Sequence, residues 1–168
     1  MKILIVSDVH NQWNMLAEAI ELGHTEGCTT LLFAGDAHEP HIYAELSAFK
    51  GDIHTVWGNN DVPHFVFQAA LLLKPRITNH GDFMDIILDG KRFFMSHYPN
   101  EVAATLTKAP DVYNVLIHGH THMRRDEHTG TAHIINPGEC CGTRYGTPSA
   151  ALFDTESMKV TFLTLSHA

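Results

Sequence analysis

The hydrophobic residues of this chain form short continuous runs, which alternate with segments of helical periodicity. The runs end in polar residues or glycine, as is typical of strands that are buried on both faces. Between the runs, apolar residues recur at helical spacing over residues 13–20 and 42–49, and Gly23 lies where the first helix is expected to end. This alternation predicts an α/β fold for the first third of the chain. The strand candidates there are residues 3–6, 30–34 and 52–57.

The pattern changes in the middle of the chain. Asp89-Gly90 separates two strand candidates, residues 84–88 and 92–95, and is typical of a tight two-residue hairpin turn. After a short helix predicted at residues 101–108, the late strands are joined by turns instead of helices, which favours a second, antiparallel sheet. Two sheets packed face to face with helices outside would form a four-layer sandwich in a single domain, residues 1–168. The late strand candidates are residues 112–117, 132–135, 150–153 and 160–163.

Short polar clusters follow five of the predicted strands directly. Because α/β sheets place ligand sites where strands end, we expect these clusters to converge on one crevice. A random scatter of polar residues would not follow strand after strand. The clusters are Asp8-Val9-His10, Gly35-Asp36, Gly58-Asn59-Asn60-Asp61, Ser96-His97 and His118-Gly119-His120-Thr121-His122.

Two of the clusters contain pairs of potential metal ligands. Asp8 and His10 are separated by one residue, as are His120 and His122. On an extended chain such side chains point to the same side, so each pair could hold one ion. The alternative for the first pair is a helix cap at Asp8 with His10 in solvent.

Three further residues fit a metal site only as part of the set. Asp36 could instead cap a helix, Asn59 lies in a sequence that forms turns readily, and His97 could be a hydrogen-bonded core histidine. Taken together, the nitrogen and oxygen donors suit Mn²⁺, Fe²⁺, Ni²⁺ or Zn²⁺ better than an all-oxygen Ca²⁺ site. His38 closely follows Asp36 and is a candidate substrate contact.

Composition narrows the class of ligand. The formal net charge is −8, which argues against binding to nucleic acid polymers or to anionic membranes. A phosphate substrate would therefore need positive charge from bound metal, and the 14 histidines supply the commonest metal ligand. Three cysteines and a short apolar N-terminal run predict a cytoplasmic protein without a disulfide framework. A loop with Cys140, Cys141 and Arg144 could border the pocket.

The ordered set of clusters resembles the calcineurin-like metallophosphoesterases, and within them the small bacterial and archaeal phosphodiesterases. The family pattern is Asp-x-His, Gly-Asp, Gly-Asn-x-Asp or Glu, a lone His, and Gly-His-x-His, and all five motifs occur here in order over residues 8–122. Asn136-Pro137-Gly138 also resembles this branch. The resemblance implies a sandwich of two mixed sheets flanked by helices.

The resemblance also implies roles for single residues. Asp8, His10 and His122 would bind one divalent metal ion, Asn59, His97 and His120 a second, and Asp36 would bridge the two. Mn²⁺ is the first expectation for both ions. A hydroxide shared by the ions would attack phosphorus, and Asn59 would help to stabilise charge on the phosphoryl oxygens.

One departure from the family pattern bears on the substrate. Many members of the wider family have histidine after the Gly-Asn pair, where it protonates the leaving group, with the next carboxylate orienting it. Here that position is Asn60, so Asp61 lacks its usual partner and could serve only to shape the turn. General acid catalysis contributes about 10²–10⁴-fold, so phosphodiesters with good leaving groups are the expected substrates.

Other functions remain open at this level. The same site could serve a phosphomonoesterase, and the same fold could serve a non-catalytic protein-binding scaffold with an impaired metal site. Here every ligand position holds a competent residue, which favours an enzyme. A histidine-rich metal store would place its histidines in polar tails, and a nuclease would need a basic groove. Assembly into a homo-oligomer is plausible, although no sequence feature requires it.

Overall fold

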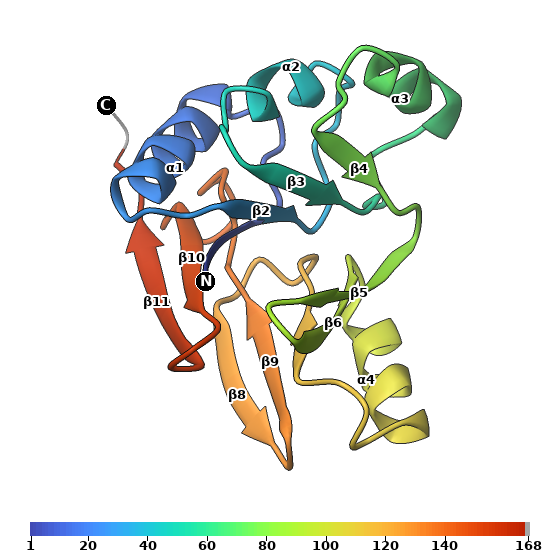
Figure 1. The fold of residues 1–168 in the computed structure, drawn as a ribbon. Coiled ribbons are helices and arrows are strands. Elements are labelled where there is room, and N and C mark those ends of the chain that lie inside the picture. The colour runs from blue at the N-terminus through green and yellow to red at the C-terminus, as the bar shows by residue number, and fades with distance from the viewer. Residues whose placement is uncertain (167–168) are drawn as a thin grey trace.

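The computed structural model describes residues 1–166 and contains two β-sheets (Figure 1). The first sheet has the strand order β11-β10-β1-β2-β3-β4. Strands β1 to β4 run parallel, whereas β10 pairs antiparallel with β1 and β11 antiparallel with β10. Its strands are β1 (Lys2–Val6), β2 (Thr30–Phe33), β3 (Asp52–Thr55), β4 (Ile77–Asn79), β10 (Ser149–Asp154) and β11 (Lys159–Thr164).

The second sheet has the order β5-β6-β7-β9-β8. Strands β6, β7 and β9 run parallel in its centre, and each edge strand, β5 and β8, pairs antiparallel with its neighbour. Both sheets are therefore mixed, as the family resemblance implied. The strands are β5 (Phe83–Leu88), β6 (Lys91–Ser96), β7 (Val115–Ile117), β8 (Arg125–Thr129) and β9 (Ala132–Asn136).

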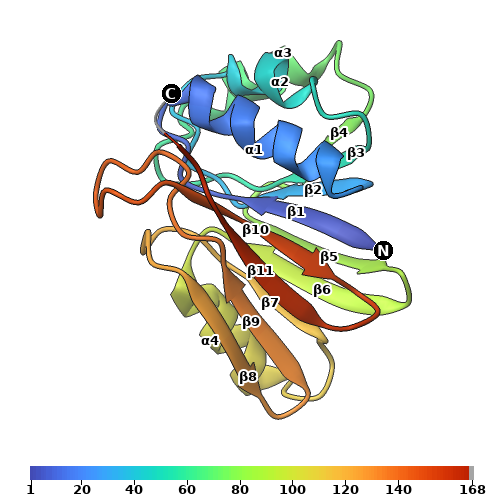
Figure 2. The same cartoon turned by 90° about the vertical axis from the view of Figure 1, so that its left-hand side faces the viewer.

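Helices cover the outer faces of both sheets and complete four layers. Figure 2 shows α1, α2 and α3 above the first sheet. Helix α4 packs on the second sheet, where Val102 forms a cluster with Phe94 and Leu116 that is separate from the core between the sheets. The four-layer sandwich expected from the sequence is thus confirmed. The helices are α1 (Trp13–Thr25), α2 (Ile42–Leu46), α3 (His64–Leu71) and α4 (Pro99–Lys108).

Strand β1 shows why the apolar runs are continuous. Leu4 and Val6 pack into the core between the first sheet and its helices, whereas Ile3 and Ile5 pack into the core between the two sheets. Successive strand residues point to opposite faces, so a strand with a core on each side needs apolar residues at every position. A third, smaller core around Phe94 lies between the second sheet and α4.

The sequence pattern assigned the late strands incorrectly. We expected a second, antiparallel sheet, but β10 and β11 join the first sheet beside β1. The cause is the segment of residues 137–148, which carries the chain from β9 in one sheet to β10 in the other. A turn-linked pair of strands fixes how the two strands pair, but it does not determine which sheet they extend.

The end of α1 also differs from expectation, whereas the hairpin does not. Helix α1 does not end at Gly23 but continues to Thr25. A Cβ at Gly23 would lie 2.9 Å from Leu4 Cδ2, so the role of this glycine is to let the helix pack close to β1. Asp89 and Gly90 have φ of 48° and 72°, as the predicted tight turn between β5 and β6 requires.

No helix within residues 1–166 has the length and apolarity needed to cross a membrane.

Candidate metal centre and pocket

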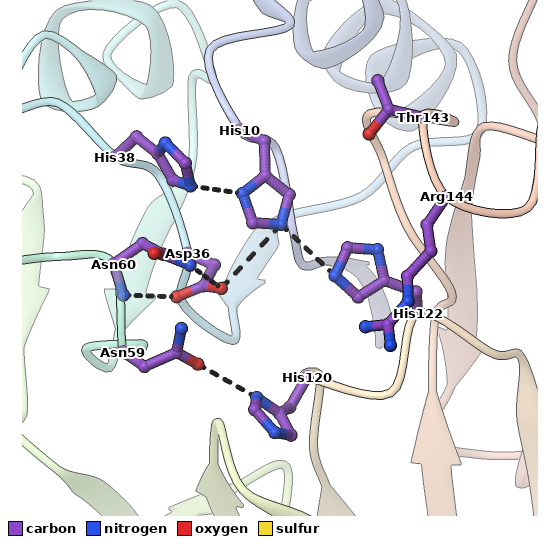
Figure 3. Close-up of a pocket in the computed structure, with 9 residues that line it drawn as sticks. All are labelled: His10, Asp36, His38, Asn59, Asn60, His120, His122, Thr143 and Arg144. Atoms are coloured by element: carbon purple, nitrogen blue, oxygen red, sulfur yellow. Dashed lines mark hydrogen bonds and ion pairs between the residues drawn. The ribbon is translucent and has the colours of Figure 1, made fainter.

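The polar clusters that follow the strands converge on one pocket of about 530 Å³ (Figure 3). Its lining comes from loops after β1, β2, β3 and β7 and from the segment between β9 and β10. Asp8 and His97 lie beneath it and are fully buried. The expected convergence is therefore observed. The lining residues are His10, Asp36, His38, Asn59, Asn60, His120, His122, Thr143 and Arg144.

A first set of donor atoms gathers around His10 and His122. The two Nε2 atoms lie 3.3 Å apart, and His122 Nε2 lies 3.4 Å from Asp8 Oδ1. His10 Nε2 lies 3.8 Å from both Asp8 Oδ1 and Asp36 Oδ2. Ligand atoms about 2.0–2.2 Å from one ion are themselves about 3.0–3.6 Å apart, so this set has nearly the spacing of a coordination shell.

A second set of donor atoms includes the same oxygen of Asp36. His97 Nε2 lies 3.5 Å from Asp36 Oδ2 and 3.3 Å from His120 Nδ1, and His120 Nδ1 lies 3.0 Å from Asn59 Oδ1. Asp36 Oδ2 thus belongs to both sets. Burial tends to raise the pKa of Asp36, but the hydrogen bond and positive charge of His97 and hydrogen bonds from Asn60 hold it well below its usual value. The shared carboxylate is therefore ionised at neutral pH.

The outer nitrogens of three histidines are held by neighbouring groups. His97 Nδ1 donates to the carbonyl oxygen of Ala34 at 2.7 Å, and His122 Nδ1 lies 2.8 Å from Glu139 Oε2. His10 Nδ1 lies 2.6 Å from His38 Nε2. A ring that donates through Nδ1 presents the lone pair of Nε2 on its other side, so His97 and His122 are oriented as metal ligands usually are.

The backbone at these residues differs from the extended chain that we assumed. Asp8, His10, Asp36, His120 and His122 have φ between 45° and 66°. The extended geometry expected for the Asp8–His10 and His120–His122 pairs is therefore wrong, although their side chains still converge. Residues other than glycine seldom adopt this left-handed conformation, which costs of order 1–3 kcal/mol each and tends to occur at functional sites.

Two glycines allow the loops to approach closely enough for this convergence. A Cβ at Gly58 would lie 2.1 Å from Asp36 Oδ1, and a Cβ at Gly119 would lie 1.9 Å from Ser7 Oγ and 2.8 Å from Asp8 Oδ2. Any side chain at these positions would collide with the loops that carry the two aspartates. The glycines of the Gly-Asn and Gly-His pairs are therefore required by packing beneath the pocket.

Asn60 and Asp61 act on the loop that carries Asp36. The Asn60 backbone N–H donates to Asp36 Oδ1 at 2.9 Å, and its side-chain amide donates to Asp36 Oδ2 at 2.7 Å. Asp61 is buried, and its carboxylate accepts hydrogen bonds from the backbone N–H groups of four residues. These are Asp36, Ala37, His38 and Gly58.

Of two residues that support the pocket from beneath, Asn136 was noted through the family resemblance, whereas Glu139 was not singled out from the sequence. Glu139 Oε2 accepts from His122 Nδ1, and Asn136 Nδ2 donates to the carbonyl oxygen of Gly119 and to Thr121 Oγ1. Glu139 is 1% exposed, and burial tends to raise its pKa, yet hydrogen bonds from His122 and from two backbone N–H groups lower it below its usual value. The signal for Glu139 was available, because it directly follows Asn136-Pro137-Gly138.

The remaining predicted pocket residues are divided by the structure. His38 and Arg144 line the pocket, whereas Cys140 and Cys141 are buried. Cys140 lies in the core between the first sheet and its helices. The Cys141 sulfur lies within 4.8 Å of ring nitrogens of His10 and His122 and contacts Glu139 Oε2 at 3.4 Å.

Comparison with known proteins identifies the family. Residues 1–158 match the model of the calcineurin-like phosphoesterase superfamily domain. This chain is a calcineurin-like phosphoesterase superfamily member. It is 31% identical over 156 residues to the phosphodiesterase MJ0936 of Methanocaldococcus jannaschii, covering 93% of this chain and 94% of that protein. It is 25% identical to the phosphodiesterase YfcE of Escherichia coli, covering 95% and 91% of the two chains.

Solved structures of other proteins have a similar fold. A structure described as a novel archaeal phosphodiesterase superposes with a TM-score of 0.89 at 30% identity, covering 98% of this chain and all of the other. Wild-type Vps29 of Entamoeba histolytica, described as complexed with zinc, superposes with a TM-score of 0.65 at 16% identity over 99% of this chain and all of the other. The second likeness concerns the fold alone.

Membership of the phosphoesterase superfamily implies divalent metal ions, and one atom beneath the pocket tests whether these residues fit them. Asp8 Oδ1 is buried and has no hydrogen-bond partner within residues 1–166, although the ring nitrogens of His10 and His122 face it. Burial raises the pKa of Asp8. A buried carboxylate oxygen without a partner is costly, and a cation among these nitrogens would compensate it. The residues of this phosphoesterase therefore fit a divalent metal ion.

Glu139→Gln tests how this phosphoesterase aligns His122. The amide keeps the shape of the carboxylate but removes its charge, and its NH₂ group would oppose one of the groups that now donate to Glu139. We expect metal affinity and kcat/KM to fall about 10–100-fold. Calorimetric titration with Mn²⁺ and steady-state assays measure both quantities.

The matched control for Glu139 is Glu127→Gln, which removes an exposed carboxylate paired with Arg125. This control is expected to bind Mn²⁺ as the wild type does. Wild-type metal affinity in Glu139→Gln would show that the His122–Glu139 contact does not orient a ligand.

Proposed function

We propose that this chain hydrolyses phosphodiesters with two divalent metal ions held in the pocket. The observation that carries the proposal is that Asp36 Oδ2 belongs to two separate sets of donor atoms. One carboxylate oxygen between two groups of imidazoles is the arrangement that a pair of bridged ions requires. The similarity to phosphodiesterases of M. jannaschii and E. coli supports hydrolysis of diesters in particular.

Each set of donors would hold one ion. Asp8, His10 and His122 would bind the first ion with Asp36 Oδ2, and Asn59, His97 and His120 would bind the second with the same oxygen. The ions, when bound, would lower the pKa of a coordinated water toward neutrality and stabilise charge on the phosphoryl oxygens. Nitrogen and oxygen donors without thiolate in either set favour Mn²⁺, with Fe²⁺, Ni²⁺ and Zn²⁺ as alternatives.

Side chains of the pocket would orient the substrate and hold Asp36 in place. Asn59 faces His120 through its oxygen, so its nitrogen is turned toward the pocket and is available to a phosphoryl oxygen (Figure 3). His38 lines the same pocket, as a substrate contact must, and also touches His10. We assign Asn60 and Asp61 to the positioning of Asp36 and its loop. Asn60 donates two hydrogen bonds to the Asp36 carboxylate, and Asp61 accepts a hydrogen bond from the Asp36 backbone N–H.

The Asn60 side chain bears on the choice of substrate. An amide that donates to Asp36 cannot protonate a leaving group near neutral pH. We expect substrates whose leaving group departs readily as an anion, and hence a preference for activated diesters over alkyl monoesters. With a net charge of −8, a small phosphate ester is a better substrate than a nucleic acid polymer.

A panel of metals and paired substrates tests the proposal. Protein stripped with a chelator is expected to be inactive, and Mn²⁺ is expected to restore the highest rate among Mn²⁺, Ni²⁺, Zn²⁺ and Mg²⁺. With each active metal, bis(p-nitrophenyl) phosphate should give a higher kcat/KM than p-nitrophenyl phosphate. Equal or faster turnover of the monoester would support a monoesterase instead, and inactivity with every metal would support a non-catalytic scaffold.

Two further expectations, one about location in the cell and one about assembly, stay predictions. These are a cytoplasmic location and assembly into a homo-oligomer. Cell fractionation and sedimentation analysis measure them directly.

A further inference from the structure

The pocket contains one basic side chain whose role has not been assigned. Among the lining residues in the described part of the chain, only Arg144 is a lysine or arginine. The others carry imidazole, amide, carboxylate or hydroxyl groups. Arg144 lies in the segment of residues 142–146, which we call the rim loop, and its side chain lines the same pocket as His122 (Figure 3).

Within the part of the chain that the structure describes, the guanidinium of Arg144 has no polar partner. Within residues 1–166 it makes no hydrogen bond or ion pair, and the ring of Tyr145 lies 5.9 Å from its Cζ. By contrast, Arg92 is paired with Asp85 and Arg125 with Glu127. The pKa of His120 is lowered first by burial, then by the charge of His97, and the charge of Arg144 contributes too, which agrees with a guanidinium close to the candidate ligands.

The backbone of the rim loop, unlike this side chain, is held firmly. Arg144 N and Tyr145 N donate to the two carboxylate oxygens of Glu139 at 2.9 and 2.5 Å. Glu139 also accepts from His122 at 2.8 Å, so a single carboxylate joins the rim loop to a candidate metal ligand. Gly142 has φ of 62°, and a Cβ there would lie 2.7 Å from Pro148 Cδ, so the start of the loop is packed tightly.

We propose that Arg144 binds a non-bridging oxygen of the substrate's phosphoryl group and of the anionic product. This inference rests on the proposed phosphoesterase function. A guanidinium offers paired N–H donors that match the oxygens of a phosphate, and it remains charged at any pH of interest. The fixed loop backbone places this donor at the pocket, and no carboxylate among residues 1–166 pairs with it, so it is available to the substrate.

Arg144→Ala is the direct test. Loss of a charged hydrogen bond to the phosphoryl group is expected to reduce kcat/KM about 10–100-fold, mainly through a higher KM. Arg144→Lys should recover part of the loss. Guanidinium chloride at millimolar concentration should restore activity to Arg144→Ala, whereas urea, which is neutral and similar in shape, should not.

A binding measurement separates this inference from the proposed function. Inorganic phosphate should bind the Mn²⁺-loaded Arg144→Ala protein about 10-fold more weakly than the wild type by calorimetry, with an unchanged number of bound Mn²⁺ ions. If the wild type hydrolyses no ester, the proposed function fails, and the phosphate titration still decides whether Arg144 binds the anion.

Arg124→Ala is the matched control for the charge. Its guanidinium lies on a neighbouring part of the surface but donates to Thr164 Oγ1 and to the carbonyl oxygen of Leu163. This variant should keep wild-type KM and phosphate affinity. The inference is overturned if Arg144→Ala keeps wild-type phosphate affinity, if it loses no more than Arg124→Ala, or if its defect comes from lost metal.

Discussion

Asp36→Asn is expected to lower kcat/KM by about 10³-fold and to reduce the number of metal ions bound per chain. The substitution preserves the shape of the side chain but removes the charge of the oxygen that both donor sets share. Metal-derived stabilisation of the transition state amounts to several kcal/mol, and each 1.4 kcal/mol corresponds to about a tenfold change in rate. Metal analysis of the purified protein and steady-state assays measure the two effects.

Asn60→Ala is a milder variant that tests the same carboxylate. It removes one hydrogen bond to Asp36 Oδ2 and leaves the carboxylate in place, so we expect a loss of about 10–100-fold with both ions still bound. Circular dichroism of the wild type, Asp36→Asn and Asn60→Ala checks that both variants retain the fold. An Asp36→Asn protein that binds two ions and turns over diesters normally would rule out the bridging role.

The fold was predictable where both faces of a strand are buried. Residues 3–6 of β1 and 31–33 of β2 each pack against a core on one side of the sheet or the other, so the apolar run itself marks the strand. Prediction failed where burial is weak. Strand β8 is largely exposed, and α3 has a single buried residue, Phe67, so neither left a clear hydrophobic pattern in the sequence.

The assignment of strands to sheets was beyond the reach of the sequence pattern. Strand β10 is buried along most of its length and pairs with β1, about 150 residues earlier in the chain. Hydrophobic periodicity describes how one segment is buried, but not which distant segment it meets. The family resemblance implied mixed sheets correctly, because it draws on a known arrangement instead of on local pattern.

The candidate site was predictable from position but not from backbone geometry. The rule that ligand sites lie at strand ends brought Asp8, Asp36 and His97 together in advance, and the structure places them within 4.8 Å of one another. The left-handed backbone at Asp8 and His10 was not foreseen, since Asp and His are enriched at positive φ but only a small share of them adopt it. Loops held in such a conformation need support from elsewhere, and the sequence does not show where that support lies.

Asp61 supplies much of this support for the loop after β2. Its Oδ1 accepts from Ala37 N at 2.7 Å and His38 N at 3.2 Å, and its Oδ2 accepts from Asp36 N at 2.9 Å and Gly58 N at 2.7 Å. Four backbone donors therefore depend on one buried carboxylate. Asp36 and His38 both have positive φ, so the carboxylate stabilises a conformation that the loop would not adopt alone.

Asp61→Ala is accordingly expected to lower the free energy of unfolding by at least about 3 kcal/mol. Each buried donor left without an acceptor costs about 1–3 kcal/mol, and water entering the space offsets only part of the total. Asp61→Asn should also be destabilised, because its NH₂ group would face backbone N–H groups where an oxygen now accepts from them. Urea unfolding in the presence of a chelator measures this cost without any contribution from bound metal.

Asp111→Ala is the control for Asp61, since Asp111 is exposed and makes no side-chain hydrogen bond within residues 1–166; it should unfold as the wild type does. If Asp61 instead acted in proton transfer alone, Asp61→Ala would retain wild-type stability and lose only activity. Wild-type stability in chelator would therefore refute the supporting role. A loss of stability there, together with weaker metal binding, would show that the conformation of the Asp36 loop is set by Asp61 before any ion binds.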